Sequence, residues 1–223
     1  MRVLVTAGPT HEPWDDVRYL ANRSTGRMGY AIAEAARRRD HEVVLISGPT
    51  GLRAPKGVRT IQVETAAEML RAALRHFGNS EALFMAAAVA DWRPARRVAG
   101  KISKAAAVRS IRLAKNPDIL AHLGKMSRGK VLVGFALEIG PKEMALASAR
   151  SKLRRKRVDL IVLNHPDSLG KREAAGVTLL TGREAVPLGE IDKRRLAGML
   201  VRFAETRRLP GTGRGAGSRL QKA

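Results

Sequence analysis

Short apolar runs alternate along the chain with longer segments in which apolar residues recur every three or four positions. The short runs are typical of buried strands, and the longer segments are typical of amphipathic helices. We predict strands over residues 3–6, 43–46, 58–63, 82–88, 111–113, 131–137 and 160–163. We predict helices over residues 26–39, 65–77, 142–157 and 191–206, and a further helix that residues 116–118 open. This alternation predicts an α/β fold with a Rossmann-like, mainly parallel sheet flanked by helices.

Local capping signals support two of these helices. Thr65 is predicted to be an N-cap with Glu68 as its capping-box partner. At the later helix, Asn116 is predicted to be the N-cap, with Pro117 in the first turn and Asp118 near the positive end of the helix dipole.

The pattern changes in two places. Residues 91–110 carry a proline, a glycine and several charges, and they interrupt the alternation. Residues 176–180 and 184–188 predict a β-hairpin before the last helix. Residues 207–223 contain several glycines and no acidic residue, so we expect a basic, disordered tail. The chain is therefore predicted to form one domain over residues 1–206, followed by this tail.

The composition narrows the class of protein. Hydrophobic residues make up 44% of the 223 residues, which is enough for a packed core. The chain has no Cys, which excludes disulfides and thiolate chemistry, and its His residues are not spaced as metal ligands, so no metal ligand can be named. The N-terminal apolar run is too short for a signal peptide or a membrane span, which favours a cytoplasmic protein.

The charge balance is strongly basic. There are 42 Lys and Arg residues against 20 Asp and Glu residues, a net charge of +22. Clustered cations bind nucleic acid through its phosphates. Here the basic residues are spread along the chain, and aromatic residues make up only 4%, which leaves little to stack on unpaired bases. A basic nucleic-acid-binding protein is therefore a weaker alternative than a positive field that gathers small anionic substrates.

Loops that follow parallel strands form ligand sites at the carboxyl edge of a sheet. Gly8 follows the first predicted strand, and Ser24 and Gly26 precede the first predicted helix. These three residues are candidates for a phosphate-binding loop, because a helix N-terminus offers backbone N–H groups and a positive dipole end. The alternative is that the glycines allow close helix packing.

A nicotinamide-dependent oxidoreductase of the Rossmann type is a further alternative, which these loops disfavour. The dinucleotide fingerprint needs G-x-G-x-x-G after the first strand and an acidic residue after the second. The first turn instead reads Gly8-Pro9-Thr10, and the second strand ends in Ser47-Gly48-Pro49.

A series of short strings runs in one order through residues 2–165. It opens with Leu4-Val5-Thr6-Ala7-Gly8-Pro9-Thr10 and Val17-Arg18-Tyr19-Leu20-Ala21-Asn22-Arg23-Ser24-Thr25-Gly26. It continues with Ala86-Ala87-Ala88-Val89-Ala90-Asp91-Trp92, Lys101-Ile102, Lys115-Asn116-Pro117-Asp118-Ile119, Val133-Gly134-Phe135-Ala136, Ala149-Arg150 with Lys152, and Asp159-Leu160-Ile161. Together these strings closely resemble the phosphopantothenate-cysteine ligase family, the synthetase half of a bifunctional bacterial coenzyme A flavoprotein.

The resemblance implies a two-step ligation. CTP activates the carboxylate of 4'-phosphopantothenate as an acyl-cytidylate, and the amine of L-cysteine then displaces CMP. It also implies Mg2+ carried by the triphosphate and a homodimer. Because a carboxylate and a triphosphate repel each other, this reaction needs cations and backbone donors, and the net charge of +22 fits that need.

The resemblance implies two catalytic residues. Asn22 matches an asparagine whose neutral amide contacts the activated acyl group, although such a residue also satisfies loop turns. Lys101 matches a lysine on a mobile loop that contacts phosphate oxygens as a point charge, although a lone surface lysine is usually only solvated.

The resemblance also implies a nucleotide site, to which Lys101 contributes. Asp91 would recognise the nucleotide through a donor group, although it also fits a turn or cap. Lys152 and Lys156 share a helix face and would reach phosphates, with a solvated basic face as the alternative. Phe135 would pack on the base or sugar, although a strand aromatic is often core. The remaining candidates are backbone contacts at the end of a strand and at the start of a helix: Ala86, Ala87, Pro117, Asp118, Ile119 and Leu120.

Three features depart from the family pattern. The segment between Lys101 and Lys115 is shorter than the usual covering loop, and His165 stands where an acidic residue is expected. No flavin-binding decarboxylase precedes Met1, so decarboxylation is expected from a separate chain or from a segment outside this sequence.

Overall fold

The computed structural model describes residues 1–103, 110–164 and 174–209. Part of the predicted covering loop (residues 104–109), His165 and residues 210–223 of the predicted tail lie outside the described residues. The division into a domain over residues 1–206 and a tail therefore stays a prediction. Within the described ranges, every helix is too short or too polar to serve as a transmembrane segment.

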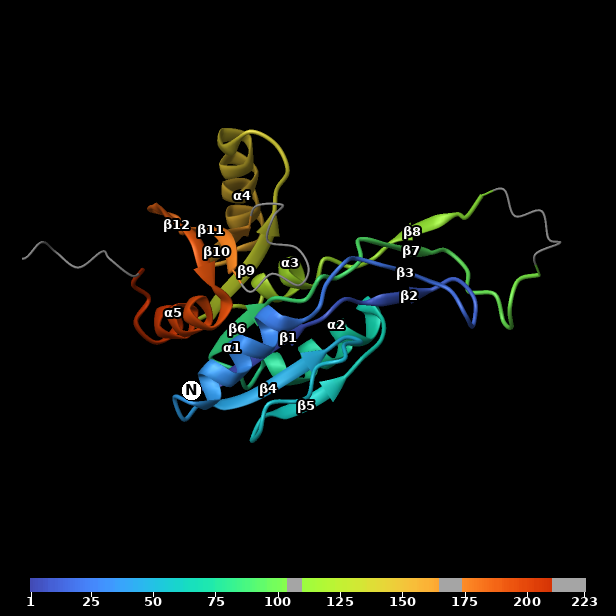
Figure 1. Ribbon diagram of the computed structural model, residues 1–223, viewed down its shortest axis with the longest axis horizontal. Coiled ribbons are helices and arrows are strands. Elements are labelled where there is room, and N and C mark those ends of the chain that lie inside the picture. Colours follow the sequence, from blue (N-terminus) through green and yellow to red (C-terminus); the bar gives the residue numbers. More distant parts are fainter. Residues whose placement is uncertain (104–109, 165–173, 210–223) are drawn as a thin grey trace, which may run out of the picture.

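The predicted α/β fold is confirmed. Eight strands form one sheet in the order β12-β11-β10-β9-β6-β1-β4-β5 (Figure 1). The six parallel strands are β1 (Arg2–Ala7), β4 (Glu42–Ser47), β5 (Arg59–Gln62), β6 (Ala82–Met85), β9 (Val131–Leu137) and β10 (Leu160–Asn164). The predicted hairpin, β11 (Ala174–Leu180) with β12 (Ala185–Asp192), extends this sheet in antiparallel pairing.

The sheet is covered by helices on both faces. On one face, α1 (Arg27–Arg37) and α5 (Lys193–Thr206) pack over a core that contains Val5, Ile32 and Leu200. On the other, α2 (Ala66–Phe77), α3 (Ile119–Gly124) and α4 (Lys142–Lys156) pack over a separate core. Because side chains of a strand alternate between faces, neighbours such as Leu4 and Val5 enter different cores.

The irregular stretch and the long first loop build an arm that leaves the carboxyl edge of the sheet (Figure 1). In it, β2 (His11–Pro13) pairs with β3 (Tyr19–Ala21), and β7 (Trp92–Pro94) pairs with β8 (Leu113–Lys115). The sequence pattern did not predict β2, β3 or β7. These strands have three residues each and no buried alternating face, which is the signal that pattern analysis detects.

Three local predictions are wrong. The strand predicted over residues 82–88 ends at Met85, because the backbone N–H of Ala87 turns to the Thr6 hydroxyl at 3.2 Å. The strand predicted over residues 111–113 is β8, which starts only at Leu113. The N-cap of α3 is not Asn116 but Asp118, which accepts from the Ala121 N–H at 3.0 Å. The capping box of Thr65 and Glu68 is confirmed.

Gly48 allows the turn after β4 to lie against the turn after β1. A Cβ at this position would overlap the carbonyl oxygen of Pro9, which is rigid backbone. We expect Gly48→Ala to destabilise the fold by at least ~2 kcal/mol, because neither strand end can retreat without breaking its ladder. Urea denaturation of both proteins measures this difference.

Gly51→Ala is the matched control, since a Cβ there meets nothing within 4 Å. Equal midpoints for Gly48→Ala and the unmodified protein would contradict this account of the turn.

Candidate active site

The three phosphate-loop candidates meet at the carboxyl end of β1. Gly8 and Gly26 both have left-handed backbone, with φ of 76° and 77°, and a Cβ on Gly26 would lie 3.3 Å from the Gly8 nitrogen. The Ser24 hydroxyl accepts from the Gly26 N–H at 3.3 Å. Gly26 is the N-cap of α1, and the first turn of this helix has no acidic residue. The N–H groups and positive dipole end there are suited to an anion, so Gly8, Ser24 and Gly26 form a candidate anion cradle.

Two buried threonines hold the connection after β6 beside this cradle. Thr10 accepts from the Ala90 N–H at 3.0 Å, Thr6 accepts from the Ala87 N–H, and the Gly8 carbonyl accepts from the Ala88 N–H at 2.9 Å. Ala86 and Ala87 therefore lie at the strand tips, next to the cradle. The sequence analysis did not identify these threonines as site residues, although a hydroxyl within an apolar strand was a signal that could have found Thr6.

Asn22 belongs to the same edge. It follows β3, and its Nδ2 donates to the carbonyl oxygen of Val89 at 2.9 Å. The side chain is thus held against the connection that carries Ala86 and Ala87.

Asp91 is brought to the start of α3 by a network that the sequence analysis missed. The Asn116 N–H donates to the Asp91 carbonyl at 2.8 Å, and Asn116 Nδ2 donates to the Ala90 carbonyl at 2.9 Å. Arg93 then donates to Asn116 Oδ1 at 3.1 Å. Asn116 is buried by these contacts, whereas the Asp91 side chain is exposed at the edge beside Pro117.

The residues at the start of α3 and on β9 have mixed exposure. Ile119 and Leu120 are buried in the core, so a ligand would meet their backbone and not their side chains. Phe135 is only partly buried and packs against the core on the α1 face.

Lys152 and Lys156 of α4 both form ion pairs. Lys152 Nζ contacts Glu138 at 2.5 Å, and Lys156 Nζ contacts Asp118 at 3.0 Å, which ties α4 to the N-cap of α3. Burial opposes ionisation of Asp118, but the Ala121 N–H and the Lys156 ammonium outweigh it and lower the pKa of this carboxyl. Neither lysine is therefore a free cation in this state of the chain.

Lys101 lies at the far end of the arm, where two aspartates hold its neighbours. Asp15 accepts from the Ile102 N–H at 3.2 Å, and Asp16 accepts from the Gly100 N–H at 2.7 Å. The Arg18 guanidinium holds the pKa of Asp15 well below its usual range; burial acts the other way, and backbone N–H groups add to the lowering.

Asn22 and Lys101 are therefore at opposite ends of the arm within one chain. Asn22 follows Ala21, which pairs with His11 at one end of β2, whereas Asp16, which binds the Gly100 N–H beside Lys101, lies beyond the other end of β2. The three extended residues of β2 alone span on the order of 10 Å. A lysine side chain is shorter than this. The structure brings Gly8, Ser24, Gly26, Asn22, Ala86, Ala87 and Asp91 to one edge, and it does not bring Lys101 there.

We predict that Asp15→Asn loosens the arm near Lys101. Because the folded pKa of Asp15 is lowered, its stabilising effect is present above the ordinary Asp pKa of about 4 and is lost as the pH falls below it. Hydrogen exchange, corrected for intrinsic rates, should show reduced protection of the Val17 and Ile102 amides at pH 7 in Asp15→Asn. In the unmodified chain, the protection of these amides should decrease as the pH falls from 5 to 2. In Asp15→Asn this decrease should be smaller.

Asp40→Asn is the control, since Asp40 is fully exposed in a left-handed turn that Asn also adopts. Unchanged amide protection in Asp15→Asn would contradict the proposed anchoring.

Comparison with known proteins gives consistent matches. The family model described as DNA/pantothenate metabolism flavoprotein C-terminal domain matches residues 1–206. The coenzyme A biosynthesis bifunctional protein CoaBC of Mycobacterium tuberculosis (strain ATCC 25618 / H37Rv) is 43% identical over 172 residues, which cover 73% of this chain and 41% of that protein. The protein of the same name from Bacillus subtilis (strain 168) is 41% identical over 180 residues, covering 80% of this chain and 44% of that protein.

A solved structure matches over nearly its whole length. The crystal structure of the C-terminal domain of CoaBC has a TM-score of 0.75 and 39% sequence identity, and the match covers 90% of this chain and 92% of that one. This chain thus spans less than half the length of the two curated relatives, but almost all of the solved domain.

Proposed function

Because the chain belongs to the DNA/pantothenate metabolism flavoprotein C-terminal domain family, we propose that it is a phosphopantothenate-cysteine ligase of coenzyme A biosynthesis. It would join 4'-phosphopantothenate to L-cysteine at the expense of CTP. The observation that carries this proposal is the anion cradle of Gly8, Ser24 and Gly26 beside Asn22, in a chain 39% identical to the solved CoaBC domain. The relatives are named as bifunctional, and the decarboxylation expected from the sequence resemblance would belong to another segment or chain.

In the proposed first step, a carboxylate oxygen of phosphopantothenate attacks the α-phosphorus of CTP, and pyrophosphate leaves. The α1 N-terminus would hold the substrate phosphate, and the Asn22 amide would orient the reacting acyl group. In the second step the cysteine amine attacks the acyl carbon, loses a proton, and expels CMP. Each step moves negative charge between oxygens, so fixed backbone donors are useful in both.

The nucleotide would lie between the connection after β6 and the start of α3. Asp91 is exposed there and can accept from a base amino group or a sugar hydroxyl. Bound phosphates would compete with Asp118 for Lys156 and with Glu138 for Lys152, which makes both lysines reachable at the cost of an ion pair.

Mg2+ is proposed as a companion of the triphosphate. Among residues 1–103, 110–164 and 174–209, no three His, Asp or Glu side chains gather as a metal site. The ion would therefore rest mainly on phosphate oxygens, where it neutralises charge, and isolated carboxylates such as Asp91 would add at most one ligand.

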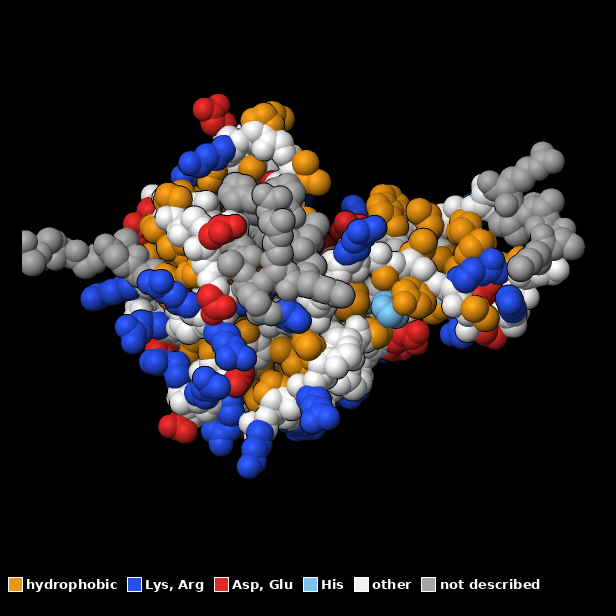
Figure 2. All heavy atoms as spheres, in the orientation of Figure 1, with side chains coloured by type: hydrophobic (Ala, Val, Ile, Leu, Met, Phe, Trp, Pro, Cys, Tyr) orange, Lys and Arg blue, Asp and Glu red, His pale blue; other side chains and the backbone are white. Residues whose placement is uncertain are grey.

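We also propose a homodimer in which the arm of one subunit completes the site of the other. Along the arm, large hydrophobic side chains are exposed at Val17, Tyr19, Trp92 and Leu113, and Figure 2 shows hydrophobic atoms along this part of the molecule. An apolar surface of this kind favours a second copy. Contact between arms would also resolve the separation of Lys101 from Asn22, because Lys101 of one subunit would approach the cradle of the other.

The two alternatives have less support. The turn after β4 carries no acidic residue for a nicotinamide ribose, and Gly48 packs it against Pro9. Trp14 and Trp92, the only tryptophans, lie on the arm and form no stacking platform over the basic helices.

The first test of this proposal is pyrophosphate release. It should require phosphopantothenate and CTP together, and amide product should appear only when L-cysteine is added. Asn22→Ala should reduce turnover by about tenfold to a hundredfold, because the acyl group loses its fixed donor. Pyrophosphate release from CTP alone would contradict the assigned acyl substrate. Release from ATP in preference to CTP would contradict the assigned nucleotide.

The second test separates a lysine acting within its own subunit from one acting on the partner's site. Lys101→Gln alone should reduce turnover by more than about threefold. An equal mixture of Asn22→Ala and Lys101→Gln subunits should then gain about a quarter of the normal activity beyond what the two kinds of homodimer retain, because half of the randomly formed dimers carry one intact site of two. Lys125→Gln, an exposed lysine at the end of α3, is the control.

Absence of recovery in dimers that demonstrably exchange subunits would show that Lys101 serves its own chain. A monomer under all assay conditions would contradict the shared site.

A further inference from the structure

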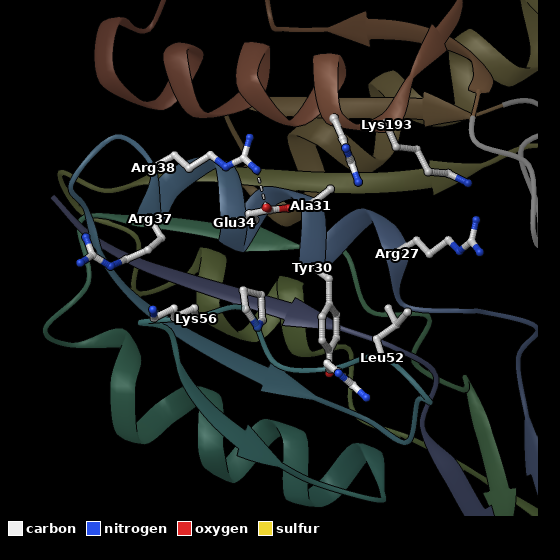
Figure 3. A pocket seen from close by; sticks show the side chains of 12 residues that line it. Arg27, Tyr30, Ala31, Glu34, Arg37, Arg38, Leu52, Lys56 and Lys193 are labelled. Atoms are coloured by element: carbon white, nitrogen blue, oxygen red, sulfur yellow. Dashed lines mark hydrogen bonds and ion pairs between the residues drawn. The ribbon is translucent and has the colours of Figure 1, made fainter.

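A cavity of about 620 Å³ lies on the α1 side of the sheet, away from the proposed nucleotide site. Its walls are α1, the start of α5 and the loop of residues 52–56 (Figure 3). Leu52, the first residue of this loop, and Val58, just after it, pack with the core under α1, whereas α3 and α4 pack with the opposite core. The eight-stranded sheet therefore separates this cavity from Lys152, Lys156 and the start of α3.

The lining of the cavity is strongly basic. Glu34 is its one acidic residue. Its cations come from three separate elements: Arg27, Arg37, Arg38, Arg53, Lys56, Lys193 and Arg194. Glu34 binds Arg38 at 2.6 Å, and Arg37 lies 3.7 Å from the fully exposed Asp40. Arg53 and Lys56 form no ion pair with any residue in the part of the chain that the structure describes. The cavity thus keeps a positive charge that the chain does not neutralise.

Two turns fix the loop that carries these two cations. The Thr50 hydroxyl accepts from the Leu52 N–H at 3.0 Å, and the Pro55 carbonyl accepts from the Val58 N–H at 3.2 Å. Gly57 has φ of 76°, and the Arg37 side chain packs against it. Arg53 and Lys56 are therefore presented from a loop that is held by a turn at each end, which reduces the entropy lost when they bind an anion.

Apolar groups lie between the cations. Figure 3 shows Tyr30 and Leu52 in the middle, with Arg27 and Lys193 to one side and Arg37 and Lys56 to the other. Ser47 donates to the Gly48 carbonyl at 2.8 Å, so the Tyr30 hydroxyl donates to Ser47 at 3.1 Å. This chain of bonds fixes the Tyr30 ring as a wall of the cavity.

From these features we propose that this cavity is a second ligand site, for a phosphorylated organic anion of about the size of a mononucleotide. Its phosphates would bind Arg53, Lys56 and Arg194, and its organic part would lie on Tyr30, Leu52 and Pro55. The volume is within the ~300–1,000 Å³ range of small-molecule pockets. Arg27, at the start of α1, lines this cavity, but neither Asn22, Lys101 nor any residue proposed for the nucleotide does, so the proposal does not rest on the ligase function.

Isothermal titration of the whole chain with ADP, without Mg2+, tests this site. Arg53→Gln/Lys56→Gln should weaken ADP binding by at least about tenfold, because each charged contact contributes substantially to affinity. Arg194→Gln, on a different element, should weaken it as well. Arg71→Gln/Arg75→Gln is the matched control, since it removes the same charge from exposed positions of α2 on the opposite face and should change affinity less than twofold.

Two further probes identify the ligand class. Leu52→Asn should weaken ADP binding by about threefold and leave pyrophosphate binding unchanged, because only the organic part lies on Leu52. Equal losses of ADP affinity in Arg53→Gln/Lys56→Gln and in Arg71→Gln/Arg75→Gln would show general charge attraction and overturn the proposal. Equal affinity for pyrophosphate and ADP would remove the organic subsite, and tighter binding of a 20-base-pair DNA duplex that displaces ADP would make this face a nucleic-acid surface instead.

Discussion

The candidate site depends on how closely three backbone connections approach one another at the carboxyl end of β1. Gly8, Gly26 and Gly48 lie where any Cβ would press on a neighbouring chain segment, and Gly48 in particular faces the Pro9 carbonyl. The Thr6 and Thr10 hydroxyls bind a fourth segment, the connection after β6. The glycines remove side chains and the threonines supply partners for buried N–H groups, so these connections can pack closely around the N-terminus of α1.

Much of the sheet was predictable because its signal is local. Buried parallel strands such as β9 read as continuous apolar runs, and the Thr65 capping box fixes the start of α2 within a few residues. The failures occurred where distant partners decide the local structure. Asn116 has the composition of an N-cap, but its side chain binds the Ala90 carbonyl, 26 residues away, and Asp118 takes the cap.

The candidate site shows the same limit. That Gly8 and Gly26 would adjoin one edge followed from the rule that loops after parallel strands share a side. That Lys152 and Lys156 would each hold an acidic partner did not follow, because Glu138 and Asp118 belong to other elements. The position of Lys101 depends on a hairpin without a hydrophobic pattern. Its distance from Asn22 could therefore be learned only from the three-dimensional structure.

The arm illustrates how a segment without a core is kept in place. Its strands are too short to bury apolar surface, so a single buried carboxylate, Asp15, gathers the N–H groups of Val17, Arg18 and Ile102 together with the Arg18 guanidinium. Such a buried charge is tolerated only when every bond is made. Because these strands bury little apolar surface, hydrophobic side chains remain exposed on the outside of the arm. A segment stabilised by polar contacts within itself and apolar outside is suited to burial against another molecule, and a second arm offers the matching surface.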